Sequence, residues 1–208
     1  MARRRGAGDG DGWSLFAAES EYAQSILCSL LGDSEGCLAA LRSALDAVPT
    51  YAPAILSLGS VEYQLERPAE GRRLFLSLLE LPDDDDLAEI IDKAGDFLIS
   101  IGAYADGLKL YRAAAARFPE VGALQQGRSC CAGHEGQHAE AIAAAEAAIA
   151  LEPDNRDFVN DLGWSLHLAS RLEEARATLA RAAAMDPADQ LAAENLRVCE
   201  SALEARAA

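Results

Sequence analysis

The sequence predicts an all-α protein built from stacked helix-turn-helix repeats, an α-solenoid. Pro119, Pro153 and Pro187 lie 34 residues apart, and a fixed period of this length is typical of such stacks. Small and large apolar residues recur in step with these prolines. Half of the 208 residues are hydrophobic and only 6% are aromatic. The abundant alanines and leucines favour helices because they lose little conformational freedom there.

Residues 1–17 are expected to form a flexible tail before the first repeat. Residues 1–12 are rich in glycine and charged residues, a composition typical of disorder. Trp13, Leu15 and Phe16 predict a short apolar segment that folds against the first helix. The chain has a basic start but no apolar segment after it, so we expect no export signal.

The prolines divide the following part of the chain into five repeats, because each proline stops the second helix of its repeat. The predicted repeats are residues 18–51, 52–87, 88–121, 122–155 and 156–189. The second repeat is irregular, since Pro82 is followed by the acidic run Asp83–Asp86. We interpret this run as a solvated loop that leads into the next helix, with a metal site as the alternative.

Small or apolar residues recur at four equivalent positions of the five repeats, and we call each such set of positions a column. Two columns hold small residues, which let the two helices of a repeat approach closely. They are Ser25, Gly59, Gly95, Ser129 and Gly163, and Cys37, Gly71, Gly107, Ala141 and Ala175. The other two lie three residues apart on the second helices and predict one apolar face. They are Leu41, Phe75, Tyr111, Ala145 and Leu179, and Ala44, Leu78, Ala114, Ala148 and Ala182.

Residues 190–208 are predicted to form a C-terminal capping helix. Ala192, Leu196, Cys199 and Leu203 recur at helical spacing and make one apolar stripe. A stack of repeats needs such a terminal element to cover its last open face.

The recurring residues resemble the signature of the tetratricopeptide repeat, W-x₂-L-G-x₂-Y…A-x₃-F…P over 34 residues. The last repeat resembles it most, through Leu162, Gly163, Leu166, Ala175, Leu179, Ala182 and Pro187. The first repeat departs from the pattern at Glu21 and Gln24, and the fourth at Gln125 and Arg128. The resemblance implies a right-handed superhelix of about five repeats whose first helices line a concave binding surface.

The net charge and the cysteine content indicate which classes of partner and which cellular compartment to expect. The net charge of −16 disfavours nucleic acids and anionic membranes and favours basic partners. No apolar run approaches the roughly 20 residues that span a membrane. The five cysteines are an odd, scattered set, which fits a reducing compartment better than a disulfide framework. We therefore expect a soluble, cytoplasmic protein.

No enzymatic activity and no cofactor are expected, because the chain has three histidines, no phosphate-binding glycine loop and no nucleophile motif. Cys130, Cys131, His134 and His138 are the one cluster with metal-ligand side chains. Their spacing matches no standard zinc pattern, so we interpret them as packed thiols beside surface histidines, with a zinc site as the alternative.

The resemblance implies that partner-binding residues lie on the first helices, on the side turned away from their apolar contacts. The candidates are Tyr22, Ile26, Leu56, Ser60, Tyr63, Asp92, Asp96, Ile99, Gln126, Cys130, His134, Asn160, Trp164 and His167. Trp164 is a candidate anchor unless its ring packs between repeats. Asp92 and Asp96 lie one turn apart and could hold a Lys or Arg, unless they form only a solvated face.

Our principal hypothesis is a non-enzymatic scaffold or adaptor that binds a basic or amphipathic peptide or helix of another protein in an acidic concave groove. One alternative is a chaperone for secretion or assembly that holds an aggregation-prone client. Another is self-association of the chain into a homo-oligomeric scaffold. Tetratricopeptide proteins that bind chaperone tails use several Lys, Asn and Arg residues, and the surface here offers Tyr22, Ile26, Ser60 and Asp92 instead. A clamp for two carboxylates is therefore disfavoured.

The first helix of the fourth repeat is predicted to be the least stable. Gly122, Gly127, Gly133 and Gly136 crowd it and its turn, and an interior glycine costs about 1 kcal/mol relative to alanine.

Overall fold

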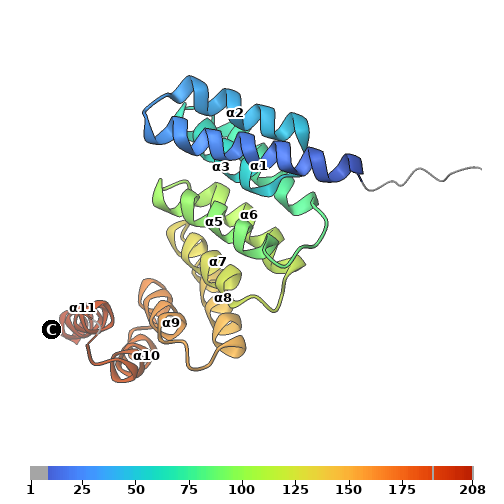
Figure 1. Cartoon of the computed structure of the whole chain (residues 1–208). Helices are drawn as coiled ribbons and strands as arrows, with labels where there is room; N and C mark the ends of the chain where they lie inside the picture. Colours follow the sequence, from blue (N-terminus) through green and yellow to red (C-terminus); the bar gives the residue numbers. More distant parts are fainter. Residues whose placement is uncertain (1–8, 189, 208) are drawn as a thin grey trace, which may run out of the picture. The chain divides into compact units, whose positions relative to one another are not determined.

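The computed structural model describes residues 9–188 and 190–207, and all regular secondary structure in these ranges is helical (Figure 1). The predicted all-α class is therefore confirmed. The α-helices are α1 (Asp9–Leu30), α2 (Ser34–Ala47), α3 (Ala52–Gln64), α4 (Pro68–Ser77), α5 (Leu87–Ser100), α6 (Tyr104–Arg117), α7 (Gly122–His134), α8 (His138–Leu151), α9 (Arg156–Leu168), α10 (Leu172–Met185) and α11 (Gln190–Ala207). A 3₁₀ helix, η1 (Leu78–Glu80), continues α4 in the irregular second repeat.

The chain forms two compact units, which we call the N-terminal unit (Met1–Ala94) and the C-terminal unit (Gly95–Ala208). Their boundary falls inside α5. From α1 to α4 and from α6 to α11, consecutive helices are joined by short connections and pack side by side (Figure 1). A longer connection, made of η1 and residues 81–86, leads from α4 to α5. Each of the five predicted repeat ranges holds two α-helices.

The turns inside the repeats share one backbone conformation. Gly32, Gly102 and Gly136 adopt φ values of 75°, 73° and 70°, in the left-handed region that glycine enters without steric cost. Glu66 and Ser170 stand at the corresponding turns of the other two repeats and adopt φ values of 59° and 60°. The left-handed turn therefore recurs in all five repeats, even where the sequence has no glycine at that position.

The start of the chain differs from the prediction. α1 begins at Asp9, so residues 9–17, which were expected to belong to a flexible tail, are helical. Trp13 and Phe16 do not fold back against the first helix; they belong to it and are 74% and 64% exposed. No proline lies between Asp9 and Leu30, so nothing of this kind stops the helix of the first repeat from continuing toward the N-terminus. Residues 1–8 of the predicted tail lie outside the described residues.

Large side chains of second helices fill the space left by glycines on first helices. A Cβ atom added to Gly59 would lie 2.4 Å from Phe75, and one added to Gly163 would lie 2.6 Å from Leu179. Both large residues are almost fully buried. The two helices of a repeat therefore approach as closely as the small column predicts, because only glycine leaves room for the ring or the leucine.

Tyr111 makes this contact twice. Its ring would be 2.2 Å from a Cβ on Gly95 in its own repeat and 2.1 Å from a Cβ on Gly127 in the next. Tyr111 is completely buried, so it joins the third repeat to the fourth.

α11 covers the end of the C-terminal unit. Cys199 packs with Leu166 and Leu179, and Ala192 packs with Val159 and Ala182. The apolar stripe of the predicted capping helix thus faces the last repeat.

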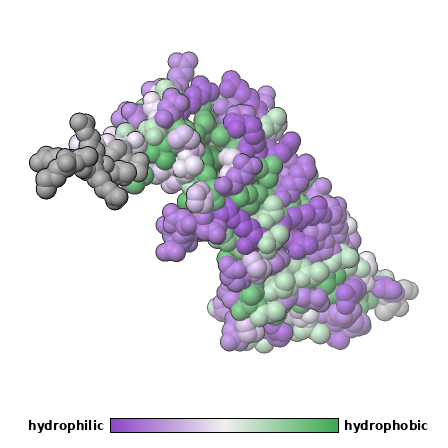
Figure 2. Space-filling view, turned by 90° about the vertical axis from the view of Figure 1, so that its right-hand side faces the viewer, coloured by the Kyte–Doolittle hydropathy of each residue, from purple (hydrophilic) through white to green (hydrophobic). Residues whose placement is uncertain are grey.

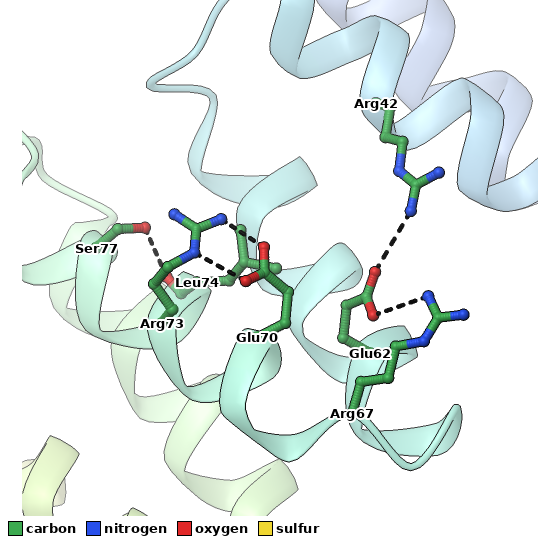
Figure 3. Close-up of polar contacts among 7 residues, drawn as sticks. All are labelled: Arg42, Glu62, Arg67, Glu70, Arg73, Leu74 and Ser77. Carbon is green, nitrogen blue, oxygen red and sulfur yellow. Dashed lines mark hydrogen bonds and ion pairs between the residues drawn. The ribbon is translucent and has the colours of Figure 1, made fainter.

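A buried carboxylate connects helices of the N-terminal unit (Figure 3). Glu62 on α3 is 3% exposed and lies 3.6 Å from the guanidinium of Arg42 on α2. Arg67, at the start of α4, donates a hydrogen bond of 3.4 Å to the other oxygen of Glu62. Glu70 and Arg73 form a second ion pair, at 2.5 Å, on the surface of α4 (Figure 3).

Glu140 has a similar role in the C-terminal unit. Arg112 on α6 and Arg128 on α7 donate hydrogen bonds of 2.5 Å and 2.7 Å to Glu140 on α8. The bond from Arg112 connects the third repeat to the fourth. The hydrogen bond from Arg112, followed by that from Arg128, lowers the pKa of Glu140 to about 2. A carboxyl group with a lowered pKa stabilises the fold above its unfolded value and loses that contribution as pH falls through its folded value.

We predict that Glu140→Gln lowers the free energy of unfolding by about 1–2 kcal/mol at neutral pH, a figure reduced for the half-exposed arginines. The difference from wild type should shrink as pH falls from about 4.5 toward about 2, because wild-type Glu140 then becomes protonated. Urea unfolding of both proteins at several pH values measures this difference in the free energy of unfolding. An equal loss at neutral and acid pH would contradict the electrostatic origin.

The glycines of α7 should respond differently to alanine. Gly127→Ala should destabilise the protein by about 1–3 kcal/mol, because the new methyl group meets the buried Tyr111 ring. Gly133→Ala should stabilise it by about 0.5 kcal/mol, since its nearest neighbour, Leu168, would be 3.7 Å away. Thermal unfolding of both variants measures these effects, and a shift of the same sign in both would refute this account.

Candidate functional site

Four of the predicted partner-binding residues line one groove in the N-terminal unit. Two hollows of about 420 Å³ and 400 Å³ share Leu56 and Lys93 and together form what we call the N-terminal groove. Ile26 and Ser60 line the first hollow, and Tyr22 lines the second. The groove is built by α1, α2, α3 and α5.

Local hydrogen bonds fix the groove's side chains. Ser25 donates to the backbone oxygen of Tyr22 at 2.7 Å, and Ser60 donates to that of Leu56 at 3.0 Å. Ser57 donates to the Tyr22 hydroxyl at 3.4 Å. These contacts hold a row of hydroxyl groups beside an apolar wall that includes Ile26, which is 46% exposed.

An acidic pocket of about 520 Å³ adjoins the groove and shares Pro53, Asp86 and Ile90 with it. Glu19 and Asp84 also line this pocket. The remaining walls include apolar side chains of α1, α3 and α5 and of the segments beside them. Among the described residues that line the groove and the pocket, Lys93 is the one base. It is already paired with Glu89 at 2.6 Å, and this hydrogen bond raises the pKa of Lys93 and lowers that of Glu89.

Two other candidates of the N-terminal unit lie outside these hollows. Tyr63 stacks on Phe75, with ring centroids 5.7 Å apart, and its ring occupies the space beside Gly71 on α4. It therefore belongs to the packing of α3 against α4. Asp92 is half-buried on α5. The joint role predicted for Asp92 and Asp96 stays a prediction.

Candidates of the C-terminal unit gather at a second, smaller hollow of about 100 Å³. Cys130 and His134 on α7 line it together with Trp164 on α9. The His134 ring stacks on Tyr104 at a centroid distance of 3.8 Å. Trp164 stacks on His167 of its own helix at a centroid distance of 4.9 Å. The rings of all three candidates are therefore held in place by stacking.

The remaining candidates of this unit differ in accessibility. Asp96 is exposed and accepts a hydrogen bond from Tyr111 at 3.3 Å, and Ile99 is half-buried. Gln126 donates to Asp161 at 2.7 Å. Asn160 is only 5% exposed, and Asn195 of α11 donates to it at 3.0 Å. Its prediction as a surface contact is wrong, because the terminal helix covers this side of α9.

The cysteines of α7 are packed rather than activated. Burial is the main cause that raises the pKa of Cys130 to about 11 and that of Cys131 to about 12, so both thiols are protonated at neutral pH. Cys131 is fully buried and would lie 2.8 Å from a Cβ on Gly107. In the described ranges, no group of three or more His, Cys, Asp or Glu side chains could hold a metal ion. In the same ranges, no helix combines the length and apolar character that crossing a membrane requires.

Sequence reasoning missed several residues of these hollows, among them Leu30 and Asp161. Leu30 lines the N-terminal groove and follows Tyr22 and Ile26 at intervals of four residues, a helical spacing that could have identified it. Asp161 lines the smaller hollow and stands one turn before Trp164. Burial raises the pKa of Asp161, although hydrogen bonds from Gln126 and Asn160 oppose this effect.

We predict that Asp161→Asn raises the unfolding temperature at about pH 7 and has little effect at about pH 3. A carboxyl group whose folded pKa is raised costs stability as pH rises through that pKa, because the buried group must then ionise. Asparagine retains an oxygen that accepts from Gln126 and carries no charge. Calorimetry at the two pH values measures the change. A loss of stability at about pH 7 would mean that the charged hydrogen bond outweighs the cost of burial.

Comparisons with known proteins show which family and which solved structures the chain is similar to. The family model described as tetratricopeptide repeat matches residues 133–190. The structure is similar to that of MamA from Desulfovibrio magneticus RS-1, with a TM-score of 0.59 and 17% identity over 89% of this chain and 99% of that chain. It is similar to YrrB, described as a TPR protein with an unusual peptide-binding site, with a TM-score of 0.60 and 20% identity over 85% of this chain and 90% of that chain.

A third similar structure is the first TPR of Spaghetti (RPAP3) bound to the HSP90 peptide SRMEEVD. Its TM-score is 0.54, with 21% identity over 58% of this chain and 96% of that chain. No curated protein matches the chain. The sequence match identifies residues 133–190 as tetratricopeptide repeat, and the likeness to these solved structures shows that the described chain has the fold of a tetratricopeptide-repeat solenoid.

Proposed function

We propose that this protein is a non-enzymatic scaffold that binds a peptide or helix of a partner protein in the N-terminal groove. The observation that carries the proposal is the meeting of Tyr22, Ile26, Leu56 and Ser60, from two helices, at one groove. The similar structures support it, since YrrB has a peptide-binding site and the RPAP3 domain holds a peptide.

The groove's chemistry favours a basic, amphipathic segment. Apolar side chains of the partner would lie against Ile26 and Leu56, where burial removes apolar surface from water. A Lys or Arg of the partner would reach the adjoining acidic pocket beside Asp84 and Asp86. A chain-terminal carboxylate is disfavoured there, because Lys93 is already paired with Glu89.

A cytoplasmic location belongs to the same proposal. All five cysteines are free, and four of them are buried. Free thiols are typical of proteins kept in a reducing compartment.

The proposal is tested with labelled synthetic peptides and fluorescence anisotropy. Amphipathic peptides with two lysines should bind, and the same peptides with glutamates in place of the lysines should not, because the groove's pocket is acidic. Ile26→Lys should weaken binding about tenfold or more, since it places a charge on the apolar wall.

Ile101→Lys is the matched control. Ile101 lies in the C-terminal unit and is 48% exposed, against 46% for Ile26, so both substitutions place the same charge on a similarly exposed side chain. Equal loss of binding in both variants would contradict a role for the groove. Absence of binding by every basic amphipathic peptide would remove the proposal.

A further inference from the structure

The outer face of α1 carries a stripe of exposed side chains, which we call the α1 seam. It consists of Trp13, Phe16, Ser20, Ala23, Leu27 and Leu30. Successive members are 3, 4, 3, 4 and 3 residues apart, the heptad spacing with which one helix packs along another. Figure 2 shows that hydrophobic residues are exposed between hydrophilic ones on one face of the molecule.

The seam is distinct from the two other sides of α1. Ala18, Ser25 and Cys28 are buried in the N-terminal unit. Tyr22 and Ile26 line the N-terminal groove, which the seam borders at its last residue, Leu30. All six seam residues are exposed, so this side of the helix does not belong to the core.

We propose that the α1 seam binds the α1 seam of a second copy of this chain, in an antiparallel pair with two-fold symmetry. The spacing is symmetric about the point between Glu21 and Tyr22. Antiparallel pairing therefore places Trp13 opposite the partner's Leu30, Phe16 opposite the partner's Leu27, and Ser20 opposite the partner's Ala23. A two-fold interface requires such self-complementarity, because the same patch meets itself.

The sizes of the side chains match this arrangement. The small residues Ser20 and Ala23 meet at the centre, where they let the two helix axes approach closely. The large residues lie at both ends, so each aromatic ring of one copy faces a leucine of the other. Parallel pairing would instead place Trp13 and Phe16 opposite the same residues of the other copy and leave the leucines to pair with each other.

The charge distribution favours a second copy over a basic partner helix. None of the six seam residues is charged, although the chain carries a net charge of −16. A basic helix would be held by carboxylates that flank the seam, and Glu19 is the one carboxylate at a flanking heptad position. In the antiparallel pair Glu19 lies opposite the partner's Gln24 and meets no like charge. Two identical uncharged seams meet without placing like charges opposite each other within the contact.

The exposed area is sufficient for a small, specific interface. Trp13, Phe16, Leu27 and Leu30 are 74%, 64%, 54% and 79% exposed, and the neighbouring Leu31 is 83% exposed. Because aromatic side chains bury about 150–250 Å² each and leucines somewhat less, these residues together offer at most on the order of 600 Å² per copy. Two copies together reach about 1,200 Å², the lower end of the range for stable protein interfaces.

Sedimentation equilibrium of the full chain tests the proposal. We expect a species of twice the monomer mass of 22.0 kDa. Phe16→Glu and Leu27→Lys should each restore the monomer, because each places a charge in two layers of the interface. The control Ile101→Lys, which adds a charge to a similarly exposed residue elsewhere, should remain dimeric.

Mixing the two monomeric variants tests the antiparallel register. In the mixed dimer, the carboxylate introduced by Phe16→Glu in one copy would face the ammonium group introduced by Leu27→Lys in the other. The second such layer would keep its native Phe16 and Leu27. The mixture should therefore dimerise at concentrations where each variant alone is monomeric. Parallel pairing predicts no such recovery, because the two new charges would not meet.

Circular dichroism should show unchanged helix content in every variant, since the substituted residues are exposed. A wild-type monomer, or a dimer that survives Phe16→Glu, would overturn the proposal. Failure of the mixture to dimerise would overturn the antiparallel register. These outcomes are separate from the peptide-binding function, because Phe16 and Leu27 line neither the groove nor the acidic pocket.

Discussion

The close approach of the two helices within a repeat is the constraint on which the rest of the structure depends. Glycine on a first helix leaves a space that a large residue of the second helix fills, as Gly59 does for Phe75 and Gly163 for Leu179. A methyl group at either glycine would collide with its neighbour. Where the fourth repeat has Ser129 in this column, the facing position is the small Ala145, and Ser129 donates a hydrogen bond of 2.8 Å to the backbone oxygen of Ala141.

This packing uses one side of each first helix and decides what its other sides can do. In the N-terminal unit, the remaining sides of α1 supply a wall of the groove and the exposed seam. In the C-terminal unit, α11 covers the last repeat and takes Asn160 out of the surface. A side of a first helix thus stays exposed only where no other element of the chain packs on it.

Acidic residues have two separate uses. Glu62 and Glu140 are each held by two arginines and connect helices of neighbouring repeats. Asp84 and Asp86 instead line an open pocket beside the groove. The carboxylates between repeats are therefore neutralised by their own chain, whereas those of the pocket give it a negative charge.

The sequence by itself determined the period, the helix pairs and the side of the early first helices that holds Tyr22, Ile26, Leu56 and Ser60. These features follow from spacing along one helix, which local geometry fixes. Only the tertiary structure decided that Asn160 is covered by α11, that Tyr63 packs on Phe75, and that Asp161 lines a hollow. Such outcomes depend on which distant helix packs over a given face, and a repeat pattern carries no information about its neighbours' side chains.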